Sequence, residues 1–286
     1  MALILDGKVV ATDIKRQLSV DVAKLATKGV VPGLGTILVG SDKSSARYVA
    51  MKHADCTEVG IESFHVSLGD DTTSDELESV IKGFNDNPMV DAILLQLPLP
   101  GQLSQLNALM SINPDKDVDG LHPINLGRLV MSEPGPLPCT PAGIVELLSY
   151  YKIEVAHKHV VVVGRGLTIG RPLALLLSSK AKNCNATVTI AHTGSSDLGE
   201  ITRSADIVIA AVGVAGLITK EMISPGTVVV GAGTPFRDGK LLSDLSDDVI
   251  EVAGAITPTI GGVGPMTRAM LLVNAVNAAN RRAGIF

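Results

Sequence analysis

A chain of 286 residues with 46% hydrophobic side chains is long enough to bury a sizeable core and to form two domains. A formal net charge of −5, with no basic block, argues against nucleic acid as a partner. No apolar stretch is long enough to cross a bilayer, and Asp6 and Lys8 stand where a signal peptide needs apolar residues, so we expect a cytoplasmic protein without membrane association.

The first half of the chain alternates between helix and strand patterns. Apolar residues recur at helical spacing in some segments, and short apolar runs flanked by turn residues separate them. The expected elements are a helix over Asp13–Lys28, a strand over Leu34–Val39, a helix over Ala46–Val59 ended by Gly60, a strand over Ile61–Val66, a helix from Ser74 to about Asn85, a strand over Val90–Leu97 and a helix over Gln102–Met110. A loop rich in Pro, Gly and Asp, residues 113–138, then marks a domain boundary.

The second half repeats the alternation. Thr140 as N-cap and Pro141 at the first helical position predict a linking helix to Tyr151. The further expected elements are strands over Val160–Val163, Thr187–Ala191, Ile207–Ala211 and Val228–Val230, a hairpin over Phe236–Leu241 that turns at Asp238-Gly239, and a last helix over about Met266–Arg282. These patterns predict an α/β protein with two lobes, an open βαβ N-terminal domain and a Rossmann-type domain whose parallel sheet binds a dinucleotide.

The segment VVVVGRGLTIGRP, residues 160–172, is the strongest local signal. An apolar strand runs into a glycine turn, and Gly170 opens an apolar helix. Free backbone N–H groups at such a helix N-terminus hold phosphate. The glycines read GxGxxxG rather than GxGxxG, so the pattern is equally typical of an ordinary glycine-rich βα turn.

Arg165 lies inside this turn and bears on the choice of cofactor. The next strand ends at Ala191, and the following residues, HTGSS, include no Asp or Glu to bind a ribose diol. A missing acid beside an arginine indicates a 2′-phosphate, hence NADP rather than NAD. The alternative is that Arg165 simply faces solvent.

Polar residues also stand at the carboxyl edge of the first sheet. Tyr48 and Lys52 are four residues apart on one helix, so their side chains share a face. Gln96 ends an otherwise apolar strand and points to the same edge. The alternatives are a surface lysine beside a half-buried tyrosine, and an amide that only fixes the proline-rich loop after it.

Three further features bear on metal or ligand binding. The segment DKDVDG, residues 115–120, resembles the start of a calcium loop, but its twelfth position is Leu126 rather than Glu, so calcium binding fails. Asp119 is then either part of a solvated turn or a ligand-facing acid, and His122 has no second ligand at a metal spacing. The cysteines (Cys56, Cys139 and Cys184) are widely spread and predict free thiols in a reducing compartment, so no metal site is proposed.

Taken together, six motifs in order resemble one enzyme family: SSARYVAMK, LLQLPLP, PDKDVDGLHPINLGRL, PCTPAGIVELL, VVVGRGLTIGRP and GGVGPMT. The chain is similar, from about Leu5 to Arg282, to the bifunctional methylenetetrahydrofolate dehydrogenase/methenyltetrahydrofolate cyclohydrolases. The resemblance implies a folate-binding catalytic domain over residues 1–139, onto which the C-terminal helix 266–286 folds back, and an NADP-binding domain over 140–265. It also implies a folate pocket between the halves and a homodimer formed through the second domain.

The resemblance carries roles onto particular residues. Lys52 is the implied catalytic lysine, Tyr48 lines the folate pocket, Gln96 tunes the lysine and Asp119 holds the pterin ring. The other implied substrate contacts are Leu97, Gly262 and Pro265, and the implied cofactor contacts are Gly164, Arg165, Gly166, Ile169, Thr193 and Thr234. The chain departs from the family at Gly166, where Ser is usual, at Ile169, where Val is usual, and at Gly231-Ala232-Gly233, where the family shows Asp-Val-Gly.

The implied activity is the NADP-dependent oxidation of 5,10-methylenetetrahydrofolate to the methenyl form and its hydrolysis to 10-formyltetrahydrofolate. That activity belongs to one-carbon metabolism, which serves purine, methionine and histidine biosynthesis. Two rival interpretations remain: another two-domain NADP dehydrogenase of the shikimate type, which would show a Lys–Asp pair and no QLPLP or GGVGPMT, and a nucleotide-sensing protein without catalysis.

Overall fold

The computed structural model of the protein describes residues 2–237 and 239–285, and the chain within these ranges forms two compact units. One unit comprises the described residues up to Ala11 together with Thr140–Thr267, and the other comprises Thr12–Cys139 and the chain from Arg268 onward. No described helix is both long and apolar enough to span a bilayer.

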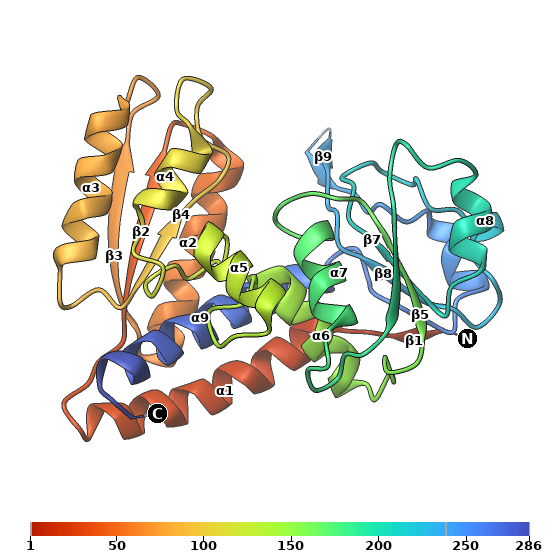
Figure 1. Ribbon diagram of the computed structural model, residues 1–286, viewed down its shortest axis with the longest axis horizontal. Coiled ribbons are helices and arrows are strands. Elements are labelled where there is room, and N and C mark those ends of the chain that lie inside the picture. Colours follow the sequence, from red (N-terminus) through yellow and green to blue (C-terminus); the bar gives the residue numbers. More distant parts are fainter. Residues whose placement is uncertain (1, 238, 286) are drawn as a thin grey trace. The chain divides into compact units, whose positions relative to one another are not determined.

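The unit that begins at Thr12 is built on a parallel three-stranded sheet in the order β3-β2-β4 (Figure 1). Its strands are β2 (Gly33–Val39), β3 (Glu62–Leu68) and β4 (Ala92–Leu95), and its helices are α1 (Gly7–Ala26, from Thr12), α2 (Lys43–Val59), α3 (Ser74–Asp86), α4 (Gln105–Ser111), α5 (Pro123–Met131) and α9 (Val263–Arg282, from Arg268). Because residues alternate across a strand, β2 faces α3 and α4 through Ile37 and Val39, and faces α1, α2 and α9 through Leu34.

Helix α2 carries two of the predicted site residues, and its ends are well defined. The carboxylate of Asp42 accepts a hydrogen bond from the Ser45 backbone N–H at 2.7 Å and caps the N-terminus. Gly60 ends the helix in the left-handed conformation, at φ 85°. The helix therefore starts at Lys43, earlier than the predicted Ala46, and stops where Gly60 indicated.

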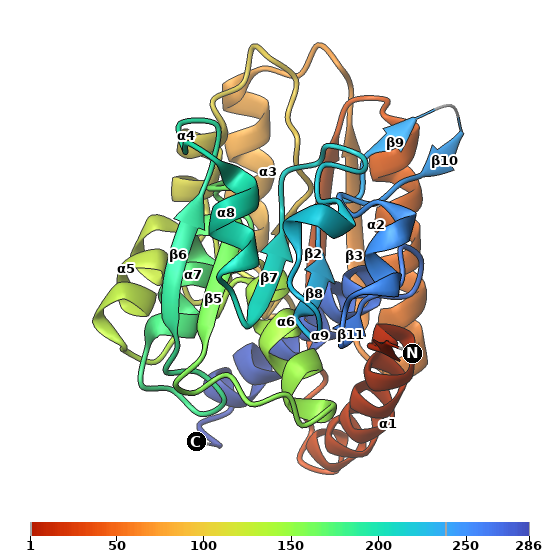
Figure 2. The same ribbon diagram turned by 90° about the vertical axis from the view of Figure 1, so that its right-hand side faces the viewer.

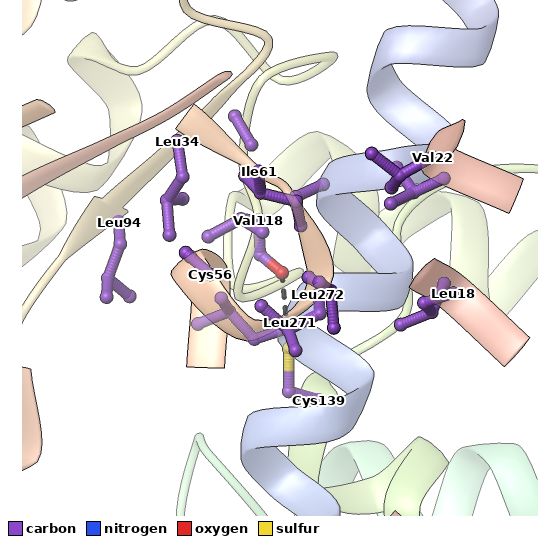
Figure 3. Packing of buried hydrophobic residues seen from close by; sticks show 14 of the residues in the cluster. Leu18, Val22, Leu34, Cys56, Ile61, Leu94, Val118, Cys139, Leu271 and Leu272 are labelled. Atoms are coloured by element: carbon purple, nitrogen blue, oxygen red, sulfur yellow. Dashed lines mark hydrogen bonds between the residues drawn. The ribbon is translucent and has the colours of Figure 1, made fainter. Parts of the chain in front are cut away.

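The core on the α2 side of this sheet is drawn in Figure 3. Leu271 and Leu272 of α9 pack into it beside Cys56 of α2, and all three side chains are fully buried. Residues from opposite ends of the chain thus form one hydrophobic cluster. The Cys139 thiol donates to the Val118 carbonyl at 3.2 Å within the same cluster.

The other unit holds a parallel six-stranded sheet in the order β1-β11-β8-β7-β5-β6, which is visible in Figure 2. Its strands are β1 (Leu3–Ile4), β5 (His159–Val163), β6 (Thr187–Ala191), β7 (Ile207–Ala210), β8 (Val228–Gly231) and β11 (Ala255–Ile256). The helices are α6 (Cys139–Tyr150, from Thr140), α7 (Gly170–Ser178), α8 (Leu198–Arg203), η1 (Lys220–Met222) and η2 (Asp247–Glu251). Four central strands with buried Val and Ile side chains, joined through crossover segments, make this a Rossmann-type sheet.

Several sequence predictions need correction. Strand β1 was not expected, and it pairs with β11, so the described residues up to Ala11 belong with the six-stranded sheet rather than with the first half of the chain. Helix α1 begins at Gly7 instead of Asp13, α6 at Cys139 instead of after Thr140, and α9 at Val263 instead of Met266. The expected loop 113–138 contains α5, and α8 and β11 were also missed. Strands β9 (Phe236–Arg237) and β10 (Lys240–Leu241) form the predicted hairpin, whose turn residue Asp238 lies outside the described residues.

Candidate active site

Tyr48, Lys52 and Gln96 form a cluster at the carboxyl edge of the three-stranded sheet. The Lys52 ammonium donates to Gln96 Oε1 at 3.2 Å and lies 4.6 Å from the centre of the Tyr48 ring. Gln96 is itself held, because its Nε2 donates to the Leu97 carbonyl at 2.7 Å. The helix spacing of Tyr48 and Lys52 and the strand-end position of Gln96 thus bring the three side chains together as predicted.

Burial controls the charge of Lys52. The residue is 4% exposed, and desolvation lowers the pKa of its ammonium below 10.5, although the negative charge of Asp119 works in the opposite direction. Burial likewise raises the pKa of Asp119, against the effect of Lys52. Both groups of this pair are therefore pushed toward their neutral forms, which makes a proton easy to move between them and a ligand.

Tyr48 and Cys139 complete the surroundings of Lys52. Burial raises the pKa of the Tyr48 hydroxyl, and the charge of Asp119 adds to the effect, so the ring stays neutral. Burial also raises the pKa of the Cys139 thiol well above 9.0. A thiol in this state is a weak nucleophile. Lys52 is therefore the basic group of the cluster.

The three acids of DKDVDG have separate positions. Asp115 lies on the surface and pairs with Arg128 at 3.1 Å. Asp117 is 2% exposed and accepts hydrogen bonds from the His122 backbone N–H and from Asn125 Nδ2. Of the three acids, Asp119 is the one whose charge acts on the pKa of Lys52, and a role of Asp119 toward a ligand stays a prediction.

His122 has a structural role. Its Nδ1 accepts from the Ile124 backbone N–H at 3.0 Å and caps helix α5. Among the described residues, no three His, Cys, Asp or Glu side chains are placed to hold a metal ion.

The glycine turn after β5 lies in the other unit and is shaped for a close ligand. At Gly164, with φ +116°, an added Cβ would come within 2.3 Å of the Ala211 carbonyl, so only glycine fits. At Gly166, by contrast, a Cβ would meet no atom within 4 Å, which is why Ser is sterically possible there. Ile169, the N-cap of α7, provides no side-chain cap. The Arg171 N–H donates to the Gly166 carbonyl at 3.2 Å and Pro172 has no N–H, so among the first three helical residues the Gly170 N–H remains available for phosphate.

Arg165 and His192 face each other above this turn. The Gly194 backbone N–H donates to His192 Nδ1 at 3.0 Å, so in the neutral ring the proton is on Nε2. Arg165 Nη1 lies 3.3 Å from that Nε2, and both atoms are then donors. Two donors converging without an acceptor between them fit an anion such as a phosphate. The sequence analysis did not predict a role for His192, although this residue directly follows β6, where an acid that binds the ribose would be expected.

The remaining predicted contacts are placed as follows. Thr193 and Thr234 are exposed residues just beyond the ends of β6 and β8. Gly262 is buried, and Pro265 lies within the first turn of α9 rather than in the expected loop. Leu97 packs half-buried against the core shared with α3 and α4. Within the unit that holds Lys52, Leu97 accepts from Gln96 Nε2 through its backbone carbonyl.

The segment Gly231-Ala232-Gly233, which lacks the aspartate implied by the resemblance, lies beside the carboxylate of Asp244. This fully buried acid accepts from the backbone N–H groups of Val212 and Val214, each at 2.9 Å. A Cβ at Gly233 would lie 2.1 Å from its carboxylate. Asp244 therefore fixes the loops after β7 and β8, a contact that no local sequence pattern could have indicated.

The fold and these two sites define a class: two-domain α/β proteins that pair a Rossmann-type nucleotide domain with a second parallel-sheet domain carrying a buried lysine. Family models agree with both halves. Residues 5–119 match the tetrahydrofolate dehydrogenase/cyclohydrolase catalytic domain, and residues 138–283 match the NAD(P)-binding domain of the same family.

Individual relatives cover the whole chain. The bifunctional protein FolD of Syntrophotalea carbinolica is 52% identical over 282 residues, 99% of this chain and 97% of that protein. The crystal structure of the FolD dehydrogenase/cyclohydrolase from Campylobacter jejuni is 40% identical, has a TM-score of 0.95, and covers 99% of this chain and 100% of its own. The Trypanosoma brucei enzyme, solved with NADP cofactor and inhibitor, is 38% identical with a TM-score of 0.93, over 99% and 98% of the two chains.

The chain belongs to the tetrahydrofolate dehydrogenase/cyclohydrolase family. The shikimate-type alternative does not hold, because a shikimate dehydrogenase shares only the fold, at 15% identity and a TM-score of 0.53.

Proposed function

We propose that the protein oxidises 5,10-methylenetetrahydrofolate with NADP and hydrolyses the methenyl product to 10-formyltetrahydrofolate. The observation that carries the proposal is the buried Lys52, hydrogen-bonded to Gln96 and flanked by Tyr48 and Asp119, in a chain that belongs to this family. NADP, when bound, supplies the hydride acceptor, so the protein has to align substrate and cofactor for the oxidation.

Hydrolysis makes a different demand, because a water molecule must lose a proton as it attacks the methenyl carbon. An amine whose pKa is lowered by burial is unprotonated more often near neutral pH, and it can accept that proton. Gln96 Oε1 fixes the position of the amine, and the Tyr48 ring limits its motion from the other side. Asp119, with its raised pKa, is the group to which the pterin ring can hydrogen-bond in this proposal.

The residues around the β5 turn fit NADP. The bare backbone at Gly164 and the Gly170 N–H at the start of α7 suit the pyrophosphate. Arg165 with His192 suits a 2′-phosphate. Ile169, Gly166, Thr193 and Thr234 border the same edge of the six-stranded sheet and are proposed as cofactor contacts. Gly262, Pro265 and Leu97 are proposed as substrate contacts.

The test is a pair of assays on the purified protein. Methylenetetrahydrofolate is supplied with NADP or NAD, and formation of the reduced nicotinamide is measured. Hydrolysis of methenyltetrahydrofolate is followed separately, without cofactor. We expect both activities, with NADP preferred over NAD. Absence of both would reject the proposed function, and a preference for NAD would reject the assignment of Arg165.

We propose further that the protein acts as a homodimer in the cytoplasm and serves the purine, methionine and histidine routes that use one-carbon folates. Support for a dimer through the Rossmann-type unit comes from β6, which is the edge strand of the six-stranded sheet and exposes Ile190 to 39%. Sedimentation at several concentrations tests it, because a chain that sediments at 29.6 kDa throughout is a monomer.

A further inference from the structure

Asn274, in the middle of α9, is a buried amide that joins two separate segments of the chain. Its Nδ2 donates to the Val118 carbonyl and to the Leu137 carbonyl, each at 2.9 Å. The side chain is 9% exposed, and an amide nitrogen has two hydrogens, so both are used by these two carbonyls. Helix α9 therefore holds the peptide group that leads into Asp119 against the segment that leads into Cys139.

The two segments also contact each other directly. The Cys139 backbone N–H donates to the Asp119 carbonyl at 3.3 Å, and the Cys139 thiol donates to the Val118 carbonyl at 3.2 Å (Figure 3). A Cβ at Gly120, where φ is +69°, would lie 2.5 Å from the Pro138 nitrogen, so the two backbones approach as closely as glycine allows. Both peptide groups that flank Asp119 are thus fixed on this side.

On its other side the same segment is attached to β4. Ile93 of β4 forms a parallel bridge with Asp117, in which the Val118 N–H donates to the Ile93 carbonyl at 3.3 Å. Partner residues advance together along parallel strands, so Asp119, two residues further on, reaches the carboxyl end of β4. This is the sheet edge at which Lys52 is bonded to Gln96. The mutual effect of the charges of Asp119 and Lys52 on their pKa values agrees with this placement.

The backbone of Asp119 is therefore held from two sides, by β4 and by α9. The peptide group between Val118 and Asp119 cannot turn without breaking the buried hydrogen bond to Asn274. A shift of about 1 Å is enough to take a hydrogen bond of ordinary length out of range. A carboxyl that has to meet a rigid ring thus depends on the bonds that fix its backbone.

We propose that Asn274 is a positioning residue of the folate site, which fixes the backbone on either side of Asp119 so that this carboxyl meets the pterin ring. The inference rests on the proposed folate function and deepens it. It gives α9 a part in substrate recognition that requires no contact between Asn274 and the substrate.

The experiment is a double-mutant cycle on substrate affinity. The dissociation constant of tetrahydrofolate is measured by calorimetry on the wild type, Asn274→Leu, Asp119→Ala and the double variant. Tetrahydrofolate carries the pterin but lacks the bridging carbon on which both reactions take place, so binding is measured without turnover. We expect Asn274→Leu to raise the dissociation constant about tenfold, the scale of one hydrogen bond between ligand and protein. In the Asp119→Ala background the same change should alter it by less than about twofold, because the carboxyl that Asn274 positions is then absent.

Two further variants separate positioning from stability. Asn277→Leu makes the same change about one turn further along α9, at a half-buried position, and should leave the dissociation constant of tetrahydrofolate unchanged. Asn274→Ser keeps one O–H donor for one of the two carbonyls and should give a smaller rise than Asn274→Leu. Thermal unfolding is recorded for every variant, and Asn274→Ser takes the place of Asn274→Leu in the cycle if the leucine variant does not fold.

An unchanged dissociation constant in the Asn274 variants would overturn the inference, as would wild-type affinity in Asp119→Ala. An equal rise in the wild-type and Asp119→Ala backgrounds would also overturn it, because Asn274 would then act on the stability of the unit and not through Asp119. A wild type that neither binds tetrahydrofolate nor oxidises methylenetetrahydrofolate would reject the proposed function instead. The two failures are therefore distinguishable.

Discussion

In the Lys52 cluster the polar groups already have partners, whereas at the β5 turn the partners are missing. Lys52 donates to Gln96 and is covered by Tyr48, and its charge is set by burial before any ligand arrives. Arg165 and His192 instead present two donors to each other, above a turn of bare backbone. The first region is organised for moving a proton, which needs a fixed pKa, and the second for holding an anion, which supplies the missing acceptor itself.

The largest expected effect is on hydrolysis in Lys52→Met. Methionine keeps the aliphatic stem and removes the amine, so packing should survive while the proton acceptor is lost. We expect methenyltetrahydrofolate hydrolysis to fall by at least about 10²-fold, with the dehydrogenase rate reduced less and methenyl product accumulating. Separate assays of the two steps on the folded variant give the answer. Unchanged hydrolysis would remove Lys52 from the mechanism, and equal losses would mean that it mainly positions substrate.

The pH dependence of hydrolysis sharpens the same point. Lys52 acts as a base only when unprotonated, and its pKa is lowered from 10.5 by burial. The catalysed rate should therefore fall as pH drops through this lowered pKa, by up to about tenfold per pH unit on the acidic side. The profile is recorded without NADP and corrected for uncatalysed hydrolysis. In Lys52→Met the hydrolysis rate should no longer fall in this way at acidic pH. If the same fall persists in the variant, it belongs to the titration of another group.

At the β5 turn we expect a smaller and more selective effect. Arg165→Ala should weaken NADP binding by at most about 3 kcal/mol, the upper end for a hydrogen bond to a charged group. The side chain is exposed, so solvent screens part of its interaction with the phosphate. NAD binding should hardly change, since NAD has no 2′-phosphate. Calorimetric titration with both nucleotides distinguishes these results. An equal weakening of both would place Arg165 at the pyrophosphate or in the loop structure.

The smallest expected effect is that of His192→Ala. The variant removes the Nε2 donor and the acceptor of the Gly194 N–H, and we expect NADP affinity to fall about threefold to tenfold, as for a single hydrogen bond. His192→Asn is the companion variant, because its amide can keep a donor near the same position. Recovery of NADP affinity in the asparagine variant supports a direct contact, and no recovery assigns His192 to loop structure alone.

Much of the fold was predictable because its signals are local. The apolar runs of β5 and β7, the glycine at the end of α2 and the spacing of Tyr48 and Lys52 all act within a few residues. Strands β1 and β11 have two residues each, and only their pairing across the chain makes them strands, which no local pattern contains. Helix α5 was hidden by the turn-forming residues around it, and its cap is the side chain of His122, a role that the sequence analysis did not predict.

The sites divide in the same way. Lys52, Gln96 and Asp119 could be chosen from helix spacing, strand ends and motif likeness. The role of His192 depends on which ring nitrogen carries the proton, and the Gly194 N–H that determines this is placed by the tertiary fold.

The central claim is that proton transfer at Lys52 and anion binding at Arg165 are separate tasks. The double variant Lys52→Met/Arg165→Ala tests it, with hydrolysis rate and NADP dissociation constant measured on the wild type, both single variants and the double variant. We predict that hydrolysis in the double variant equals that of Lys52→Met and that its NADP affinity equals that of Arg165→Ala, because independent sites contribute additively. A double variant whose NADP affinity or hydrolysis rate departs by about tenfold from these values would contradict the account.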